Sequence, residues 1–211
     1  MSTLPPRRDV IVIGASAGGL PHIRTLLELL PANLPAIVLA VLHRPGDQVS
    51  HLREVLAGKS RMQVVEAVHG DELLVGVCYL GQPAEHLGID ELVRAKLSPD
   101  PGGARRGRTI DDLFVSVARH AGPRVIGVVL SGALRDGTEG LAAIKRAGGI
   151  ALVQSPAEAQ FAGMPESAIA YGHIVDLVAP TEELAQAIER YVHGEPLAAR
   201  PQGAGPGNPG G

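Results

Sequence analysis

The sequence has almost no cysteine and few aromatic residues. Among its 211 residues, Cys78 is the only cysteine, tryptophan is absent, and aromatic side chains make up 2%. A single cysteine excludes an intrachain disulfide framework and a zinc site built on several cysteines. With so few aromatic side chains, the chain lacks the residues on which proteins that bind single-stranded nucleic acids stack the bases. Its net charge of -3 also differs from the basic charge that is typical of nucleic-acid-binding proteins. We therefore expect no nucleic-acid partner.

Long apolar runs are missing as well. Charged residues, proline or glycine interrupt every apolar stretch before it reaches the ~20 residues that a transmembrane helix requires. Residues 1–8 lead straight into a strand pattern and lack the charged head, apolar run and cleavage site of a secretory signal. Residues 194–211 are rich in Gly, Pro and Ala and have too little apolar bulk to order themselves. We expect a cytoplasmic protein with no membrane insertion, a short N-terminal lead and a flexible tail.

The apolar residues that are present make up 45% of the chain and are mainly Val, Ile, Leu and Ala. This composition is typical of a buried parallel sheet covered by helices. Strand patterns are expected at residues 10–13, 36–42, 124–130 and 150–153, and helical patterns at 20–30, 48–56, 109–121, 138–147, 165–171 and 181–192. Their alternation predicts one α/β domain over residues 9–193, with a doubly wound, largely parallel sheet and helices on both faces. Residues 63–97, where turns separate short β-like pieces, are expected to add a β-hairpin insert.

A serine lies in a glycine-rich turn between the first strand and the first helix. Residues 14–18 read Gly-Ala-Ser-Ala-Gly, which matches the Gly-x-Ser-x-Gly pattern of hydrolase nucleophiles in sequence and context. The glycines allow a sharp turn that exposes the Ser16 hydroxyl, and N–H groups at the helix start suit an oxyanion. The alternative is a phosphate-binding turn of a nucleotide-binding fold, although Ser16 stands where the Gly-x-Gly-x-x-Gly pattern needs its second glycine. On this motif alone, both functions have equal weight.

Two further strand-end loops supply an imidazole and a carboxylate. His43 directly follows the second strand, and Asp136 lies in the loop after residues 124–130. The carboxyl ends of parallel strands meet at one edge of a sheet, where the sites of such folds lie. An imidazole can accept the proton of a serine hydroxyl, and a carboxylate can orient that imidazole. Taken separately, His43 also fits an ordinary loop histidine, and Asp136 fits a turn or a cap of the helix that follows.

The motifs together resemble the chemotaxis protein-glutamate methylesterases, the CheB family. Residues 10–19 resemble the family's nucleophile segment, and residues 42–45 resemble its Gln-His-Met-Pro segment. Residues 128–137 are similar to its Leu-Thr-Gly-Met-Gly-x-Asp-Gly segment, and residues 110–118 and 163–165 add further matches. The resemblance extends over about residues 9–193 and implies the Rossmann-like methylesterase fold.

The resemblance also implies a reaction and its partners. The reaction is hydrolysis of γ-glutamyl methyl esters on the cytoplasmic helices of methylated chemoreceptors, together with deamidation of certain receptor glutamines. Ser16 would be the nucleophile, His43 the general base and then acid, and Asp136 the orienting group. Backbone N–H groups at Ala17 and Ala133 would be the oxyanion donors. No metal ion and no organic cofactor are expected.

Some positions depart from the family pattern. Ala17 replaces a threonine, Leu42 a glutamine, and Ala133 and Leu134 replace Met-Gly. Leu134 in the place of a glycine is expected to change the path of the loop and reshape the site. A non-catalytic binding module in a signalling complex is therefore an alternative function. The resemblance begins at residue 9 and includes no receiver domain, so a separate receiver or signalling protein is a further expected partner.

Overall fold

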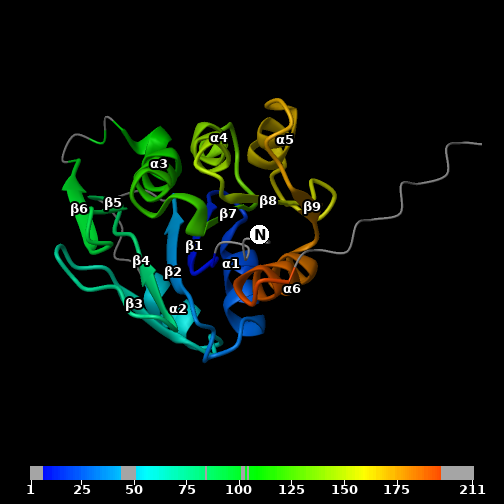
Figure 1. The fold of residues 1–211 in the computed structure, drawn as a ribbon. Helices are drawn as coiled ribbons and strands as arrows, with labels where there is room; N and C mark the ends of the chain where they lie inside the picture. Colours follow the sequence, from blue (N-terminus) through cyan, green and yellow to red (C-terminus); the bar gives the residue numbers. More distant parts are fainter. Residues whose placement is uncertain (1–6, 44–50, 84, 101–102, 104, 196–211) are drawn as a thin grey trace, which may run out of the picture.

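The chain folds around a seven-stranded sheet in which every neighbouring pair is parallel (Figure 1). This computed structural model describes residues 7–43, 51–83, 85–100, 103 and 105–195. The strand order is β3-β4-β2-β1-β7-β8-β9. The strands are β1 (Val10–Ala15), β2 (Ile37–Leu42), β3 (Gln63–Glu66), β4 (Val77–Leu80), β7 (Val125–Val129), β8 (Ile150–Gln154) and β9 (Leu177–Ala179). The expected doubly wound parallel sheet is confirmed.

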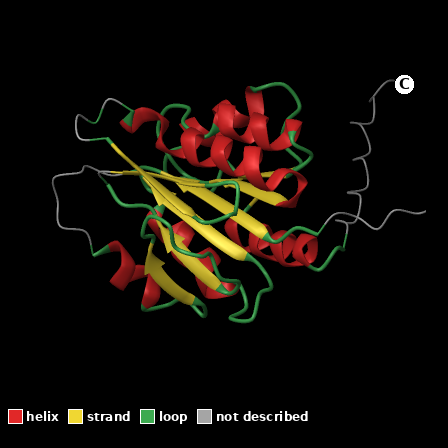
Figure 2. Cartoon of the chain, turned by 60° about the vertical axis from the view of Figure 1, so that its left-hand side comes forward, coloured by secondary structure: helices red, strands yellow, loops and turns green. Residues whose placement is uncertain are grey.

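Helices cover both faces of this sheet (Figure 2). They are α1 (Leu20–Leu29), α2 (Leu52–Ala57), α3 (Thr109–Ala121), α4 (Thr138–Arg146), α5 (Gly163–Ala170) and α6 (Thr181–Val192), with short 3-10 turns η1 (Arg106–Arg108) and η2 (Gly122–Arg124). Helices α1, α2 and α6 contribute to the apolar core on one face, and α3, α4 and α5 to the core on the other. Both cores follow from the two-residue period of the strands, which sends successive side chains to opposite faces.

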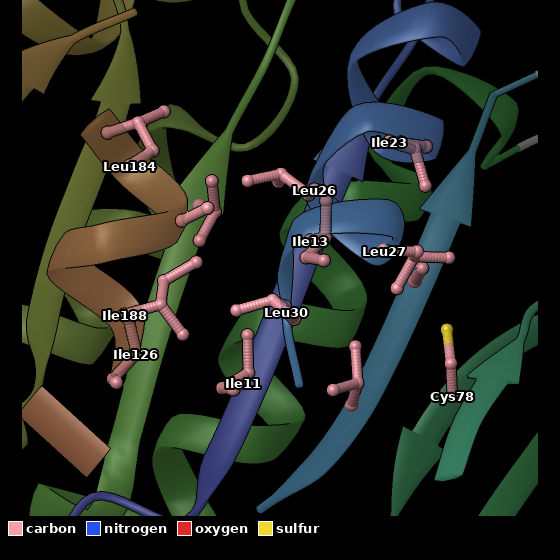
Figure 3. Close-up of a cluster of buried hydrophobic side chains, with 14 of the residues drawn as sticks. Ile11, Ile13, Ile23, Leu26, Leu27, Leu30, Cys78, Ile126, Leu184 and Ile188 are labelled. Carbon is pink, nitrogen blue, oxygen red and sulfur yellow. The ribbon is translucent and has the colours of Figure 1, made fainter. Parts of the chain in front are cut away.

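Strand β1 shows why the central strands contain so few polar residues. Ile11 and Ile13 face the core under α1 and α6, while Val10 and Val12 face the core under α3 and α4, and all four are fully buried. Cys78 on β4 belongs to the first of these cores (Figure 3). Its burial raises the pKa of the thiol to about 12, so little of the reactive thiolate forms at neutral pH.

The region from residue 63 to residue 97 differs from the prediction in its first half. Strands β3 and β4 pair in parallel with each other, and β4 pairs in parallel with β2, so both belong to the main sheet. The antiparallel hairpin consists only of β5 (Glu85–Ile89) and β6 (Ala95–Pro99). The local sequence of such short strands does not reveal the direction in which they pair, and β4 joins the main sheet through β2, which lies much earlier in the chain.

The hairpin is fixed to α3 by polar contacts. The Ser116 hydroxyl donates to the backbone oxygen of Ile89 and accepts from its N–H. His86 on β5 is buried between two carboxylates, with Nε2 3.1 Å from Asp100 and Nδ1 3.5 Å from Asp112. The hairpin is therefore joined to α3 by polar contacts at Ser116 and Asp112.

The ends of several predicted segments differ or fall outside the description. Arg108 is the N-cap residue of α3, and no side-chain bond caps that helix from this position. Residues 48–50 of the second predicted helix, residues 1–6 of the expected lead and residues 196–211 of the expected tail lie outside the described residues. In the part of the chain that is described, no helix has the length and apolar character needed to cross a membrane.

Candidate functional site

The loops that leave β1, β2 and β7 are joined by backbone hydrogen bonds beyond the ends of the strands. The His43 N–H donates to the oxygen of Ala15 at 2.9 Å, and the Ser16 N–H donates to the oxygen of Ser131 at 3.0 Å. Backbone hydrogen bonding therefore continues beyond the end of β1, to the residue after β2 on one side and to the loop after β7 on the other. This continuation fixes where Ser16 and His43 leave the sheet and brings the loop after β7 alongside them.

The three side chains expected from the sequence line one cavity of about 430 Å³. Its lining consists of Ser16, His43, Gly107, Ala133, Leu134, Arg135, Asp136, Met164 and Ser167. The Ser16 Oγ lies 3.4 Å from the His43 Nδ1. This is within reach of a hydrogen bond, and apo contacts of this kind shorten when substrate binds. A hydroxyl and an imidazole so placed can act as nucleophile and base.

Asp136 is held at the N-terminus of α3. Its Oδ2 accepts the N–H of Ile110 at 3.1 Å, and its Oδ1 accepts the N–H of Asp111 at 3.0 Å. The carboxylate therefore caps a helix, which is one of the alternatives that the sequence allows for Asp136. The capped helix is α3, however, and not α4, the helix that follows Asp136 in the chain. The side chain comes from a loop more than twenty residues away, so local sequence gives no sign of this contact.

The environment of Asp136 raises its pKa from 3.8 to about 6. Burial is the main cause, since the residue is only 8% exposed and the charged form loses hydration. The N–H bonds from Asp111 and Ile110 lower the pKa, and the nearby carboxylate of Asp111 raises it. Burial also raises the pKa of Asp111, which accepts the N–H of Gly140 at 2.7 Å. Two neighbouring carboxyl groups therefore have raised pKa values, and one of them, Asp136, lines the cavity.

Gly132 lets two chain segments approach the nucleophile. A Cβ atom on Gly132 would lie 2.9 Å from the Ser16 Cβ and closer still to the Met164 Sδ. Its own N–H donates to the oxygen of Phe161 at 2.9 Å. The position tolerates no side chain, because the nucleophile turn and the start of α5 contact it from two sides.

The two expected oxyanion donors differ in position. Ala133 lines the cavity, whereas Ala17 is exposed and does not line it. Within the described ranges, neither backbone N–H donates a hydrogen bond, while those of Ser16 and Gly132 are both used. Ala17 and Ala133 thus retain donors for an incoming oxygen, and their role as oxyanion donors stays a prediction.

The loop after β7 has an unusual backbone at Leu134. Its φ is +65°, a left-handed conformation that non-glycine residues rarely adopt. The Ser167 hydroxyl donates to the Leu134 oxygen at 3.2 Å, and a Cβ on Gly163 would lie 2.9 Å from the Leu134 nitrogen. Leu134 therefore keeps the backbone conformation that suits the glycine of the family motif. Contacts with α5 support this conformation.

Several residues of the site have no role in the sequence prediction. Met164 and Ser167 on α5 line the cavity, as does Gly107 in η1. The Gly-Met-Pro segment at residues 163–165 is the one signal that marks this region. The hydrogen bonds from the first-turn N–H groups of α3 to Asp136 are likewise not predicted from the sequence. In the described residues, no group of three or more His, Cys, Asp or Glu side chains is arranged to hold a metal ion.

Comparison with known proteins places these features in a family. A family model described as CheB methylesterase matches residues 11–188. A protein-glutamate methylesterase/protein-glutamine glutaminase of Moorella thermoacetica is 37% identical over 198 residues, which are 90% of this chain and 46% of that protein. A second protein of this name, from Anaeromyxobacter dehalogenans, is 40% identical over 182 residues, or 86% of this chain and 53% of that one. The chain spans about half the length of these curated relatives.

A solved structure matches the fold over nearly its whole length. The crystal structure of the Thermotoga maritima CheB methylesterase catalytic domain superposes with a TM-score of 0.79 and 28% sequence identity. The match covers 88% of this chain and 99% of that domain. Together with the family match over residues 11–188, it shows that the chain belongs to the CheB methylesterase family.

Proposed function

We propose that the protein is a serine hydrolase that removes methyl esters from glutamate side chains of methylated chemoreceptors and deamidates receptor glutamines. The observation that carries the proposal is the 3.4 Å contact between Ser16 Oγ and His43 Nδ1 in a cavity that Asp136 also lines. The names of the curated relatives, protein-glutamate methylesterase/protein-glutamine glutaminase, support this substrate class.

In the first half of the reaction, His43 takes the hydroxyl proton of Ser16 while the oxygen attacks the ester carbonyl carbon. The carbonyl oxygen becomes an oxyanion, which the N–H groups of Ala17 and Ala133 stabilise. The protonated imidazole then gives its proton to the leaving methoxide, so methanol departs and an acyl-serine remains. With a glutamine side chain, the same proton transfer releases ammonia.

In the second half, His43 removes a proton from water, and the hydroxide attacks the acyl-serine. Collapse of this intermediate returns the proton to Ser16 and releases a glutamate side chain. Asp136 assists both halves by orienting the imidazole and stabilising its cation. That role requires the ionised carboxylate, so the raised pKa of Asp136 places a limit on activity at low pH.

The proposal extends to partners and location. The partner is the cytoplasmic helical region of a methylated chemoreceptor, and a receiver or signalling protein controls the reaction. The protein therefore acts in the cytoplasm.

A fluorophosphonate probe and a methylated chemoreceptor test the reaction. We expect the probe to label the wild type and the receptor to release methanol, and Ser16→Ala to abolish both. Ser167→Ala is the matched control, because Ser167 lines the same cavity but lies on α5. Labelling that persists in Ser16→Ala, or is lost only in Ser167→Ala, would refute the assignment of the nucleophile. Receptor binding without methanol release would favour the alternative, a binding module.

A further inference from the structure

Apolar side chains stand exposed beside the polar centre of the cavity. Leu134 in the loop after β7 is 82% exposed, and Phe161, just before α5, is 44% exposed. Phe161 flanks the nucleophile turn, since its ring carbon Cδ2 lies 3.0 Å from the position of a Cβ on Gly18. Met164, which lines the cavity, is fully buried. The serine thus lies in a cavity with an exposed apolar side chain in its wall and another beside the nucleophile turn.

The backbone at Leu134 holds its side chain in this exposed position. The left-handed φ of +65° is unfavourable for leucine, and a chain free to relax would leave it. Contacts on both sides prevent relaxation: Ser167 bonds to the Leu134 oxygen, and Gly163 packs against the backbone. The loop is also tied at its start, where the Ser131 hydroxyl donates to the Ala17 oxygen at 2.9 Å.

An exposed leucine fixed in this way gains contact area when a ligand covers it, and it loses little conformational freedom. The leaving group of a methyl ester is a single methoxy group, which has too little apolar surface to cover a leucine side chain. The covering group must therefore come from the acyl side, that is, from the peptide segment that carries the modified side chain.

We propose that Leu134 is a specificity-determining residue that contacts an apolar side chain of the substrate next to the modified glutamate. This inference rests on the proposed function, and it assigns the preferred substrate as a peptide segment with an apolar neighbour of the ester.

Two peptides test this contact. Both contain one glutamate γ-methyl ester, and they differ only in the flanking residues, which are leucine in one and serine in the other. We expect the wild type to hydrolyse the leucine peptide with a kcat/KM about tenfold higher, the effect of covering most of one leucine side chain. The difference should lie in KM, because a contact that is present before and during the reaction changes binding alone.

Two variants separate the side chain from the backbone. Leu134→Ala removes most of the side chain and keeps the unfavourable φ, whereas Leu134→Gly removes both. We expect either variant to reduce the preference to about twofold, mainly through a higher KM for the leucine peptide. Leu92→Ala is the matched control, because Leu92 is a 65% exposed leucine in the turn of the distant β5–β6 hairpin, and it should keep the tenfold preference.

The outcomes distinguish this inference from the proposed function. Equal hydrolysis of both peptides by the wild type, or an unchanged preference in Leu134→Ala, would overturn the role of Leu134 and leave the esterase intact. A preference that is lost in Leu134→Gly but kept in Leu134→Ala would assign the effect to the loop backbone and overturn the contact. If neither peptide is hydrolysed and the probe fails to label Ser16, the proposed function falls, and this inference falls with it.

Discussion

Comparing the wild type with Asp136→Asn should show that ionisation of this carboxyl group changes stability and activity in opposite directions. Asparagine has the shape of aspartate but does not titrate, so the difference between the two proteins isolates the ionisation of one carboxyl group. In the folded chain the pKa of Asp136 is about 6, against 3.8 without burial. A folded-state pKa above the unfolded value means that protonation favours the folded chain. The stability contribution is therefore fully present below pH 3.8 and is lost as pH rises through about 6.

The size of the effect follows from this pKa shift. Between pH 7.5 and pH 4.5, the wild type should gain about 2 kcal/mol of unfolding free energy relative to Asp136→Asn, and about 3 kcal/mol at still lower pH. The variant also loses one acceptor for the N–H groups of Ile110 and Asp111, because an amide has a single oxygen. That loss of roughly 1–3 kcal/mol is independent of pH and changes only the offset between the two curves.

Urea unfolding of both proteins at four pH values from 4.5 to 7.5 measures this difference. Asp90→Asn is a control of opposite sign, because backbone hydrogen bonds lower the pKa of this exposed carboxyl group. The advantage of the wild type over Asp90→Asn should shrink as pH falls. A difference between wild type and Asp136→Asn that stays constant from pH 4.5 to 7.5 would refute the raised pKa of Asp136. Hydrolysis by the wild type should decline as pH falls through about 6, while its stability relative to Asp136→Asn increases.

Three other substitutions test separate parts of the structure. Gly132→Ala places a Cβ against the sulfur of Met164, and we expect it to lower the unfolding free energy by about 1–3 kcal/mol and to abolish probe labelling, measured by urea titration and fluorophosphonate labelling. His86→Leu leaves the carboxylate of Asp112 without the imidazole 3.5 Å away, so the unfolding free energy should fall by about 2 kcal/mol, and an unchanged melting temperature would contradict this. Leu134→Gly relieves a left-handed leucine at the cost of a more flexible unfolded chain, so urea titration should show a net gain of roughly 0.5–1 kcal/mol, whereas Leu134→Ala should show none.

The parts of the fold that depend on local pattern could be predicted from the sequence. Buried strands such as β1 and β7 are continuous apolar runs, and the residues that follow them must lie at one edge of a parallel sheet. This rule is sufficient to place Ser16, His43 and Asp136 around one cavity. The strands β3 and β4 could not be predicted in the same way, because their assignment to the main sheet depends on pairing with β2 and on no local feature.

The contacts that shape the site are also long-range. The bonds from the first turn of α3 to Asp136 join residues 25 and 26 positions apart, and neither partner carries a sequence mark of the other. Leu134 is an intermediate case. Its position in the place of a glycine predicts an altered loop, which stays a prediction. The structure adds that Leu134 has a left-handed φ and that its side chain is exposed to solvent.

The carboxylate of Asp136 has a consequence for how related sequences should be interpreted. Because it satisfies two N–H groups at the start of α3, its loss harms folding as well as chemistry. A descendant of this protein that no longer turned over any substrate would still be under selection to keep a hydrogen-bond acceptor there. Ser16 is different, because its hydroxyl contacts the imidazole of His43 and caps no helix. The serine, and not the aspartate, is the position whose replacement would reveal that a member of the family has given up catalysis.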